Sequence, residues 1–158
     1  PTAAGPCGDK TKRYNDCGNG TVTDTVTGLI WLKQANCIAT TGWEDAKKAA
    51  AGLKNGDCML TDGSAPGDWR LPTRAEWEET MKNALAQGCT GPTLTNDEGT
   101  ACISAGPSSF TGVESDYYWS STSEAAERAY FGDLDHGHLL QGNLFNTLKV
   151  WPVRGGQR

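Results

Sequence analysis

The sequence predicts an α+β fold in which two helices lie within a mostly β, loop-rich frame. Two segments begin with the pattern Thr-x-x-Glu and carry a tryptophan, which is typical of helix starts. Several short runs of β-branched and aromatic residues are bounded by turn formers and favour strands. Glycine accounts for 20 of 158 residues, nearly twice the usual share of about 7 %, so much of the chain is expected in loops. The length suits one domain over residues 1–158.

The first part of the chain predicts an arm followed by a β-hairpin. Residues 1–20 are rich in turn formers and are expected to form an N-terminal arm held by a disulfide. Thr21–Asp24 and Leu29–Leu32 then predict two strands, because threonine, valine and isoleucine favour extended backbone. Aspartate and glycine in residues 24–28 supply the chemistry of the connecting turn.

Two helices are expected next, each opened by a capping box. In this motif the threonine side chain accepts from the backbone N–H three residues on, and the glutamate reaches back. Thr41 and Glu44 open the first helix, expected over residues 43–53, and Thr73 and Glu76 open the second, expected over residues 74–86. Arg70, just ahead of the second helix, is expected to make a bidentate contact with a carboxylate or with carbonyl groups.

The rest of the chain predicts a long loop and then short strands. Residues 88–116 lack a helix or strand pattern, and so long an irregular segment is usually functional or specially stabilised. Short antiparallel strands are expected around residues 117–122, 128–131, 139–140 and 148–154, with a turn at residues 135–138. At least five of the six tryptophans are expected in the core.

The cysteines predict three disulfides and an oxidising compartment. Their number is even, and no two have the C-x-x-C spacing of a zinc or thioredoxin-like site. Six cysteines allow 15 connectivities. We expect neighbours to pair, as Cys7–Cys17, Cys37–Cys58 and Cys89–Cys102. The protein is therefore expected to be secreted, extracellular or on a bacterial cell surface, as a mature or trimmed form.

Five segments, in this order, resemble the family named for the C-terminal domain of the Legionella collagen-like protein. They are GTVTDTVTGLIW at residues 20–31, WEDA at 43–46, DWRLPT at 68–73, YWSST at 118–122 and VR at 153–154. Residues 70–78 also resemble the formylglycine-generating-enzyme branch of the C-type lectin fold. The resemblance implies a C-type-lectin-like fold with small antiparallel sheets and long loops. It also implies a secreted or surface-attached bacterial protein, because the namesake domain is an adhesin that binds sulfated glycans.

Several functions are disfavoured by composition. The net charge of −5 shows no basic surplus for nucleic-acid binding or for capturing sulfate groups. No apolar run approaches the roughly 18 residues of a membrane span. The chain also lacks the Glu-Pro-Asn, Gln-Pro-Asp and Trp-Asn-Asp motifs of calcium-dependent lectins, and the catalytic motifs of hydrolases and metalloproteases. We therefore expect a protein that is not an enzyme.

Candidate binding residues are found in the last third of the chain. Asp133 and Asp135 would share one face of an extended strand and suit Ca²⁺, whereas His136 and His138 would suit Zn²⁺ or Cu²⁺. The alternative is a solvated hairpin tip without a metal. Ligand contact is expected from the loop at residues 91–116 and from residues 133–146. The residues chosen are Asp116, Tyr117, Tyr118, Asp133, Asp135, His136, His138, Asn143 and Asn146.

Two functions remain as hypotheses. The first is a non-catalytic recognition or adhesion module that binds a surface glycan through hydrogen bonds to neutral hydroxyl groups. The second is a structural or assembly subunit, such as part of a pilus tip, a surface layer or an extracellular fibre, which contacts other protein chains or associates with itself.

Overall fold

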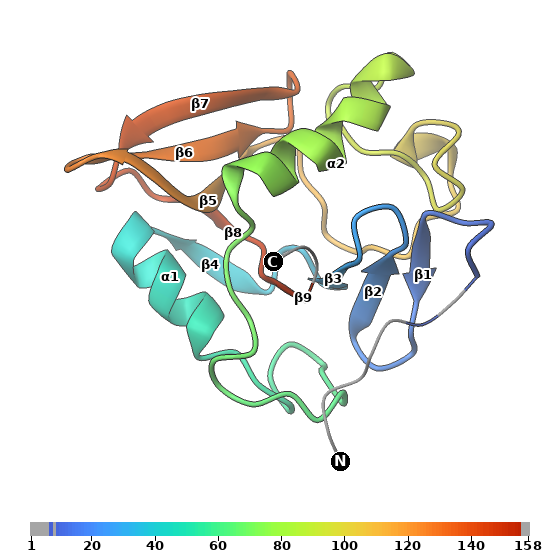
Figure 1. The fold of residues 1–158 in the computed structure, drawn as a ribbon, viewed down its shortest axis with the longest axis horizontal. Coiled ribbons are helices and arrows are strands. Elements are labelled where there is room, and N and C mark those ends of the chain that lie inside the picture. The colour runs from blue at the N-terminus through green and yellow to red at the C-terminus, as the bar shows by residue number, and fades with distance from the viewer. Residues whose placement is uncertain (1–6, 8, 156–158) are drawn as a thin grey trace.

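The computed structural model describes Cys7 and residues 9–155 and contains two β-sheets and two α-helices (Figure 1). The smaller sheet has the strand order β1-β2-β3-β9, with bounds Tyr14–Asp16, Thr21–Asp24, Leu29–Leu32 and Val153–Gly155. The larger sheet has the order β4-β8-β5-β6-β7, with bounds Ile38–Thr41, Leu148–Val150, Tyr117–Ala125, Arg128–Asp133 and His138–Asn143. The helices are α1 (Trp43–Ala51), α2 (Arg74–Ala86) and a short 3-10 helix (Ile103–Ala105). The α+β class is confirmed, whereas the likeness to C-type lectins stays a prediction.

The smaller sheet is built on the hairpin expected near the N-terminus. Strands β2 and β3 have the predicted bounds and pair antiparallel, with Val22 opposite Trp31. Strand β1 extends this hairpin from within the segment expected to be an arm, and the last strand, β9, pairs antiparallel with β3 on the other side. The strand signal expected around residues 148–154 corresponds to two strands, β8 and β9. Pro152 separates β8 from β9, and these strands belong to different sheets.

Helix α2 has the predicted bounds and the predicted capping box. The Thr73 side chain accepts from the N–H of Glu76, and the Glu76 carboxylate accepts from the N–H of Thr73 at 2.8 Å. The same carboxylate binds the Arg70 guanidinium in a bidentate pair at 2.7 and 2.8 Å. Arg70 also donates to the carbonyl of Gly155 at 3.1 Å, so it joins the helix start to β9.

Helix α1 starts at Trp43 as predicted, but Thr41 does not cap it. The N-cap is Gly42, which makes no side-chain cap, and the helix ends at Ala51 rather than at residue 53. Thr41 belongs instead to β4, where it pairs with Leu148 of β8. Sheet pairing with a distant segment therefore overrides the local capping pattern.

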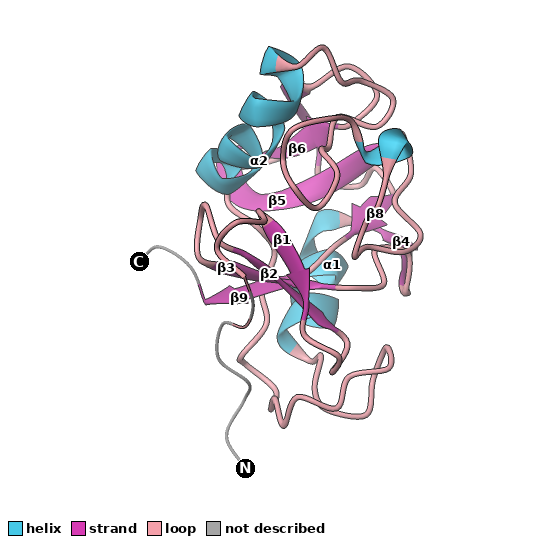
Figure 2. Cartoon of the chain, turned by 90° about the vertical axis from the view of Figure 1, so that its right-hand side faces the viewer, coloured by secondary structure: helices cyan, strands magenta, loops and turns pink. Residues whose placement is uncertain are grey.

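The core is built around the tryptophans, all six of which are buried. Trp77 of α2 packs against Tyr118 of β5, whereas Trp43 of α1 shares a cluster with Trp119 of the same strand. Because successive strand residues point to opposite faces, the two helices cover opposite faces of the larger sheet. Figure 2 shows α2 lying along β5 and β6.

The three disulfides join the neighbouring cysteines expected from the sequence: Cys7–Cys17, Cys37–Cys58 and Cys89–Cys102. Cross-links of this kind are typical of proteins that mature in an oxidising compartment, which agrees with an extracellular location. Among the described residues, neither α-helix has the length and apolar character needed to cross a membrane.

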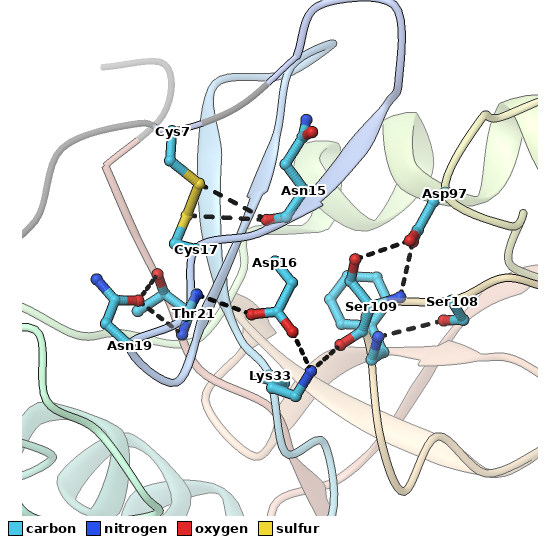
Figure 3. Close-up of polar contacts among 12 residues, drawn as sticks. Cys7, Asn15, Asp16, Cys17, Asn19, Thr21, Lys33, Asp97, Ser108 and Ser109 are labelled. Carbon is cyan, nitrogen blue, oxygen red and sulfur yellow. Dashed lines mark hydrogen bonds and ion pairs between the residues drawn. A yellow bond between two sulfur atoms is a disulfide. The ribbon is translucent and has the colours of Figure 1, made fainter.

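Much of the long loop at residues 88–116 is packed inside the protein. Residues 93–97 and 109–110 are buried. The Asp97 carboxylate accepts from the backbone N–H of Ser109 at 2.7 Å and from its hydroxyl at 2.8 Å (Figure 3). Lys33 of β3 donates to the carbonyl of Ser109 at 2.9 Å and pairs with Asp16 of β1. These bonds fasten the loop to the smaller sheet, so only its exposed stretches are open to a ligand.

Candidate functional site

One end of the larger sheet presents two half-exposed side chains, Tyr117 and Leu140, beside Phe131, which is buried in the cluster that includes α1. Tyr117 lies opposite Asp133, which in turn lies opposite His138, so these residues form one row across β5, β6 and β7. The next row on the same face contains Phe131 opposite Leu140. The Tyr117 and Phe131 rings pack at 5.0 Å between centroids. Tyr117 is 40 % exposed and Leu140 is 38 % exposed.

Asn146 borders the same face. A Cβ atom built on Gly142 of β7 would lie 2.7 Å from the Phe131 ring and 3.0 Å from the Asn146 amide nitrogen, so both side chains lie over that glycine. We call Tyr117, Phe131, Leu140 and Asn146 together the Tyr117 face. A glycine at position 142 keeps this surface flat, because any larger residue would displace Phe131.

The long loop and the β6–β7 turn, the two segments from which ligand contact was expected, meet beside this face. The Ser115 hydroxyl donates to the Asp135 carboxylate at 2.6 Å, and the N–H of Leu134 donates to the carbonyl of Asp116 at 3.0 Å. Lys149 of β8 approaches Glu114 at 3.2 Å and Asp116 at 3.9 Å. The result is an exposed polar border with carboxylates, a hydroxyl and one ammonium group.

Asp133 is buried, and its carboxylate stabilises the turn. Its carboxylate is 3 % exposed and accepts from the N–H of Asp135 at 2.9 Å, from the N–H of His136 at 3.3 Å and from Nδ1 of His136 at 3.0 Å. The hydrogen bond that His136 donates to Asp133, together with the charges of Asp133 and Asp135, raises the pKa of His136 above its usual value. The His136 and His138 rings stack at 6.2 Å between centroids.

The expected alternation of Asp133 and Asp135 along a strand is wrong. Residues 134–137 form a turn, so the two carboxylates are not presented side by side. Among the described residues, no group of three or more histidine, cysteine, aspartate or glutamate side chains is arranged to hold a metal ion. The calcium prediction therefore rests on residue types alone.

Tyr118 and Asn143 were also predicted to contact a ligand, and both make hydrogen bonds within the protein. Tyr118 is fully buried between Trp77 and Trp151, its hydroxyl accepts from the N–H of Glu114 at 3.0 Å, and burial raises its pKa to about 12. A contact between Tyr118 and a ligand is thus excluded. Asn143 lies opposite Arg128 at the far end of the hairpin, about 17 Å from His138 at the usual rise per residue. Its side chain accepts from the N–H of Phe145 at 2.8 Å.

The structure also has hollows that the sequence did not indicate. A groove of about 800 Å³ lies between α2 and the start of β7, and its walls include Arg74, Glu78, Lys82 and His138. Arg74, Glu78 and Lys82 follow one another at intervals of four residues and therefore lie on one side of α2. This spacing is visible in the sequence and could have indicated a charged helix side. A second hollow of about 540 Å³ lies beside the Arg70–Glu76 pair.

A family model described as the Lcl C-terminal domain matches residues 20–154. The chain belongs to the Lcl C-terminal domain family. In this Lcl C-terminal domain the matched segment contains the whole Tyr117 face, both α-helices and two of the three disulfides, whereas β1 and Cys7–Cys17 lie before it. A comparison with curated proteins found no match.

The Asp133–His136 bond of this Lcl C-terminal domain can be tested by titration. Asp133→Asn removes the charge beside His136, so we expect the pKa of His136 to fall back toward about 6.5. Because the pKa is raised in the folded protein, the stabilisation is fully present below about 6.5 and is lost as the pH rises through the folded value. NMR chemical shifts of the imidazole protons measure this, with Asp57→Asn, remote from both histidines, as the control. An unchanged His136 titration in Asp133→Asn would contradict the assignment.

Proposed function

We propose that this protein is an extracellular recognition module that binds a surface glycan without catalysing a reaction on it. The observation that carries the proposal is the Tyr117 face, where half-exposed apolar side chains lie next to polar groups. A sugar ring presents an apolar C–H side and a rim of hydroxyl groups. A tyrosine offers an apolar body with a polar tip, which suits both.

The polar border suits neutral hydroxyl groups better than sulfate. Asp116 and Asp135 offer acceptors for hydroxyl protons, and the Asn146 amide can both donate and accept. Glu114 and Asp116 surround Lys149, so the one ammonium group at this border is already balanced by carboxylates. The overall charge of −5 supports the same preference.

The lack of catalysis is part of the proposal. The chain has two histidines, and Nδ1 of His136 is held by Asp133. Within the described part of the chain, neither histidine hydrogen-bonds to a serine, threonine or cysteine, so there is no nucleophile–base pair of the usual kind. These observations support binding as the activity.

A glycan array with matched variants tests the proposal. Tyr117→Ala removes the stacking surface, and we expect affinity for the bound glycan to fall at least tenfold, or about 1.4 kcal/mol. Tyr117→Phe keeps the ring and should keep most of the affinity. Val26→Ala, an exposed aliphatic change in the β2–β3 turn, serves as the control. We expect binding to survive EDTA.

Two outcomes would contradict this proposal. One is an array on which the wild-type protein binds nothing, with or without EDTA. The other is glycan binding that Tyr117→Ala and Val26→Ala affect equally, because the Tyr117 face would then have no part in it.

A second candidate is an assembly subunit that contacts other protein chains in a pilus, surface layer or fibre. The observation in its favour is the free edge of β7. Light scattering over a wide concentration range distinguishes open assembly, in which mass grows without limit, from a species of fixed size.

A further inference from the structure

Strand β7 is the outer edge of the larger sheet. It pairs only with β6 among the described residues, through six consecutive residue pairs without a register shift. Figure 1 shows β7 as the outermost strand. An edge strand leaves alternate N–H and C=O groups unpaired along its length, which makes it a template for pairing with another chain.

The other sheet edges are protected, whereas this one is not. Strand β4 has a register shift against β8, and β1 and β9 are only three residues long. In addition, Arg70 bridges to Val153 and covers β9. Strand β7 has six residues, with no proline and no lysine, arginine, aspartate or glutamate. Proteins commonly use such charges, prolines and irregularities to prevent edge pairing.

One cation does reach this edge. Arg128 of β6 donates to the carbonyl of Gln141 at 3.2 Å, in an exposed position. Breaking an exposed hydrogen bond of this kind costs little free energy, because water or another N–H can donate to the same carbonyl. Arg128 therefore does not close the edge to a partner strand.

We propose that two copies of this protein associate through β7, antiparallel, about a two-fold axis that passes through the sheet at Leu140. A two-fold axis perpendicular to a sheet pairs residues of the same face, so Leu140 lies opposite Leu140 of the second copy. Leu139 then lies opposite Gln141, and His138 lies opposite Gly142. The two Leu140 Cβ atoms are about 5 Å apart in such a pair, and their contact buries a side chain that is 38 % exposed in one copy.

The charges of the hairpin favour this arrangement. The acidic turn with Asp133 and Asp135 lies beyond one end of β7, and the neutral segment from Asn143 to Asn146 lies beyond the other. Antiparallel pairing places each acidic turn beside the neutral segment of the second copy, so the two acidic turns stay apart. The exposed Phe145, 84 % accessible in one copy, is brought to the same boundary.

The dimer also determines how the two proposed glycan-binding faces are oriented relative to each other. Because the axis is perpendicular to the sheet, both Tyr117 faces point in the same direction and meet at Leu140. The dimer thus presents two equivalent sites to one glycan surface. This second part rests on the proposed function, whereas the β7 pairing rests on the edge alone. A bivalent contact raises affinity for a dense surface by about 10²- to 10⁴-fold over a single site.

A charge-swap experiment tests the pairing. We expect the wild-type mass in light scattering or sedimentation to rise with concentration from 16.8 kDa towards twice that value. The interface is small, so we expect this transition between about 10 µM and about 1 mM. Leu140→Lys and Leu140→Glu each place like charges against each other at the axis, and each alone should stay monomeric. An equimolar mixture of the two should form dimers again.

The outcomes separate this inference from the proposed function. Val26→Lys introduces the same charge at an exposed position in the β2–β3 turn, far from β7 in sequence, and this variant should dimerise as the wild type does. A monomeric wild type at about 1 mM, or a mixture that fails to recover dimers, overturns the β7 pairing. Binding to a dense glycan surface is measured separately with the wild type, below and above the concentration at which it dimerises, because Leu140 itself belongs to the Tyr117 face. If the dimer binds no more tightly than the monomer, the pairing stands and the bivalent use of it is wrong.

Discussion

Arg13→Ala is expected to lower the free energy of unfolding by about 3–5 kcal/mol, because it leaves a buried carboxylate without its partner. The Arg13 guanidinium donates to both oxygens of Asp24, at 3.0 Å each. The Arg13 side chain is 3 % exposed and that of Asp24 is fully buried. Asp24 also accepts from the N–H groups of Val26 at 3.0 Å and Thr27 at 3.4 Å, two neutral donors that cannot replace the lost charge. Urea denaturation of both proteins measures the difference.

A surface ion pair provides the matched control. Lys54 approaches Asp57 at 3.6 Å, with both side chains about half exposed, so Lys54→Ala should change stability by about 1 kcal/mol or less. Replacing Arg13 and Asp24 together by methionine and leucine should recover much of the loss, since no charge is then left buried. Equal effects of Arg13→Ala and Lys54→Ala would show that burial of the Arg13–Asp24 pair has no energetic importance.

Trp77→Ala is expected to cost about 3–5 kcal/mol, the usual range for deleting a buried aromatic side chain. Trp77 is completely buried and joins both sheets to α2. Its ring packs against Trp31 of β3 at 5.3 Å, Tyr118 of β5 at 5.8 Å and Trp151 at 6.1 Å. Its indole N–H donates to the carbonyl of Trp119 at 3.2 Å, and that carbonyl would lose its donor.

Phe145→Ala is the control for Trp77, because it removes an aromatic ring that is 84 % exposed. We expect its effect to stay within about 0.5 kcal/mol. Thermal unfolding followed by circular dichroism compares the two variants. A Trp77→Ala protein as stable as Phe145→Ala would mean that the contacts between α2 and the two sheets do not hold the fold together.

The parts of the fold that could be predicted depend on local chemistry. The β2–β3 hairpin and α2 have the expected bounds because turn residues and a capping box specify them within a few positions. Strands β1 and β4 were not predicted, since each exists only through pairing with another segment. Thr41 shows the limit clearly: its local pattern matches that of Thr73, but its partner is Leu148, over a hundred residues away.

The sequence indicated which segments carry candidate binding residues but not how their side chains are arranged. Residue types indicated that the long loop and the β6–β7 turn carry adaptable polar groups, and Ser115 and Asp135 do meet. The sequence could not distinguish Tyr117 from Tyr118, because the register of β5 with β6 decides which of two neighbouring strand residues faces the core. Tyr118 is fully buried, whereas Tyr117 is 40 % exposed. The role of Asp133 in the turn could not be predicted either. Its carboxylate accepts from the backbone N–H groups of Asp135 and His136, and the positions of these groups depend on the turn geometry.

The pairing of β3 with β9 has a consequence for folding during synthesis. These strands lie near opposite ends of the matched family segment, so the smaller sheet is completed only after nearly all of the domain has been synthesised. The disulfide partners, in contrast, are only 10, 21 and 13 residues apart, so each pair becomes available for oxidation soon after its second cysteine emerges. Covalent closure of local loops can thus precede sheet completion, and the unfinished chain is already restrained by disulfides before its last strand is in place.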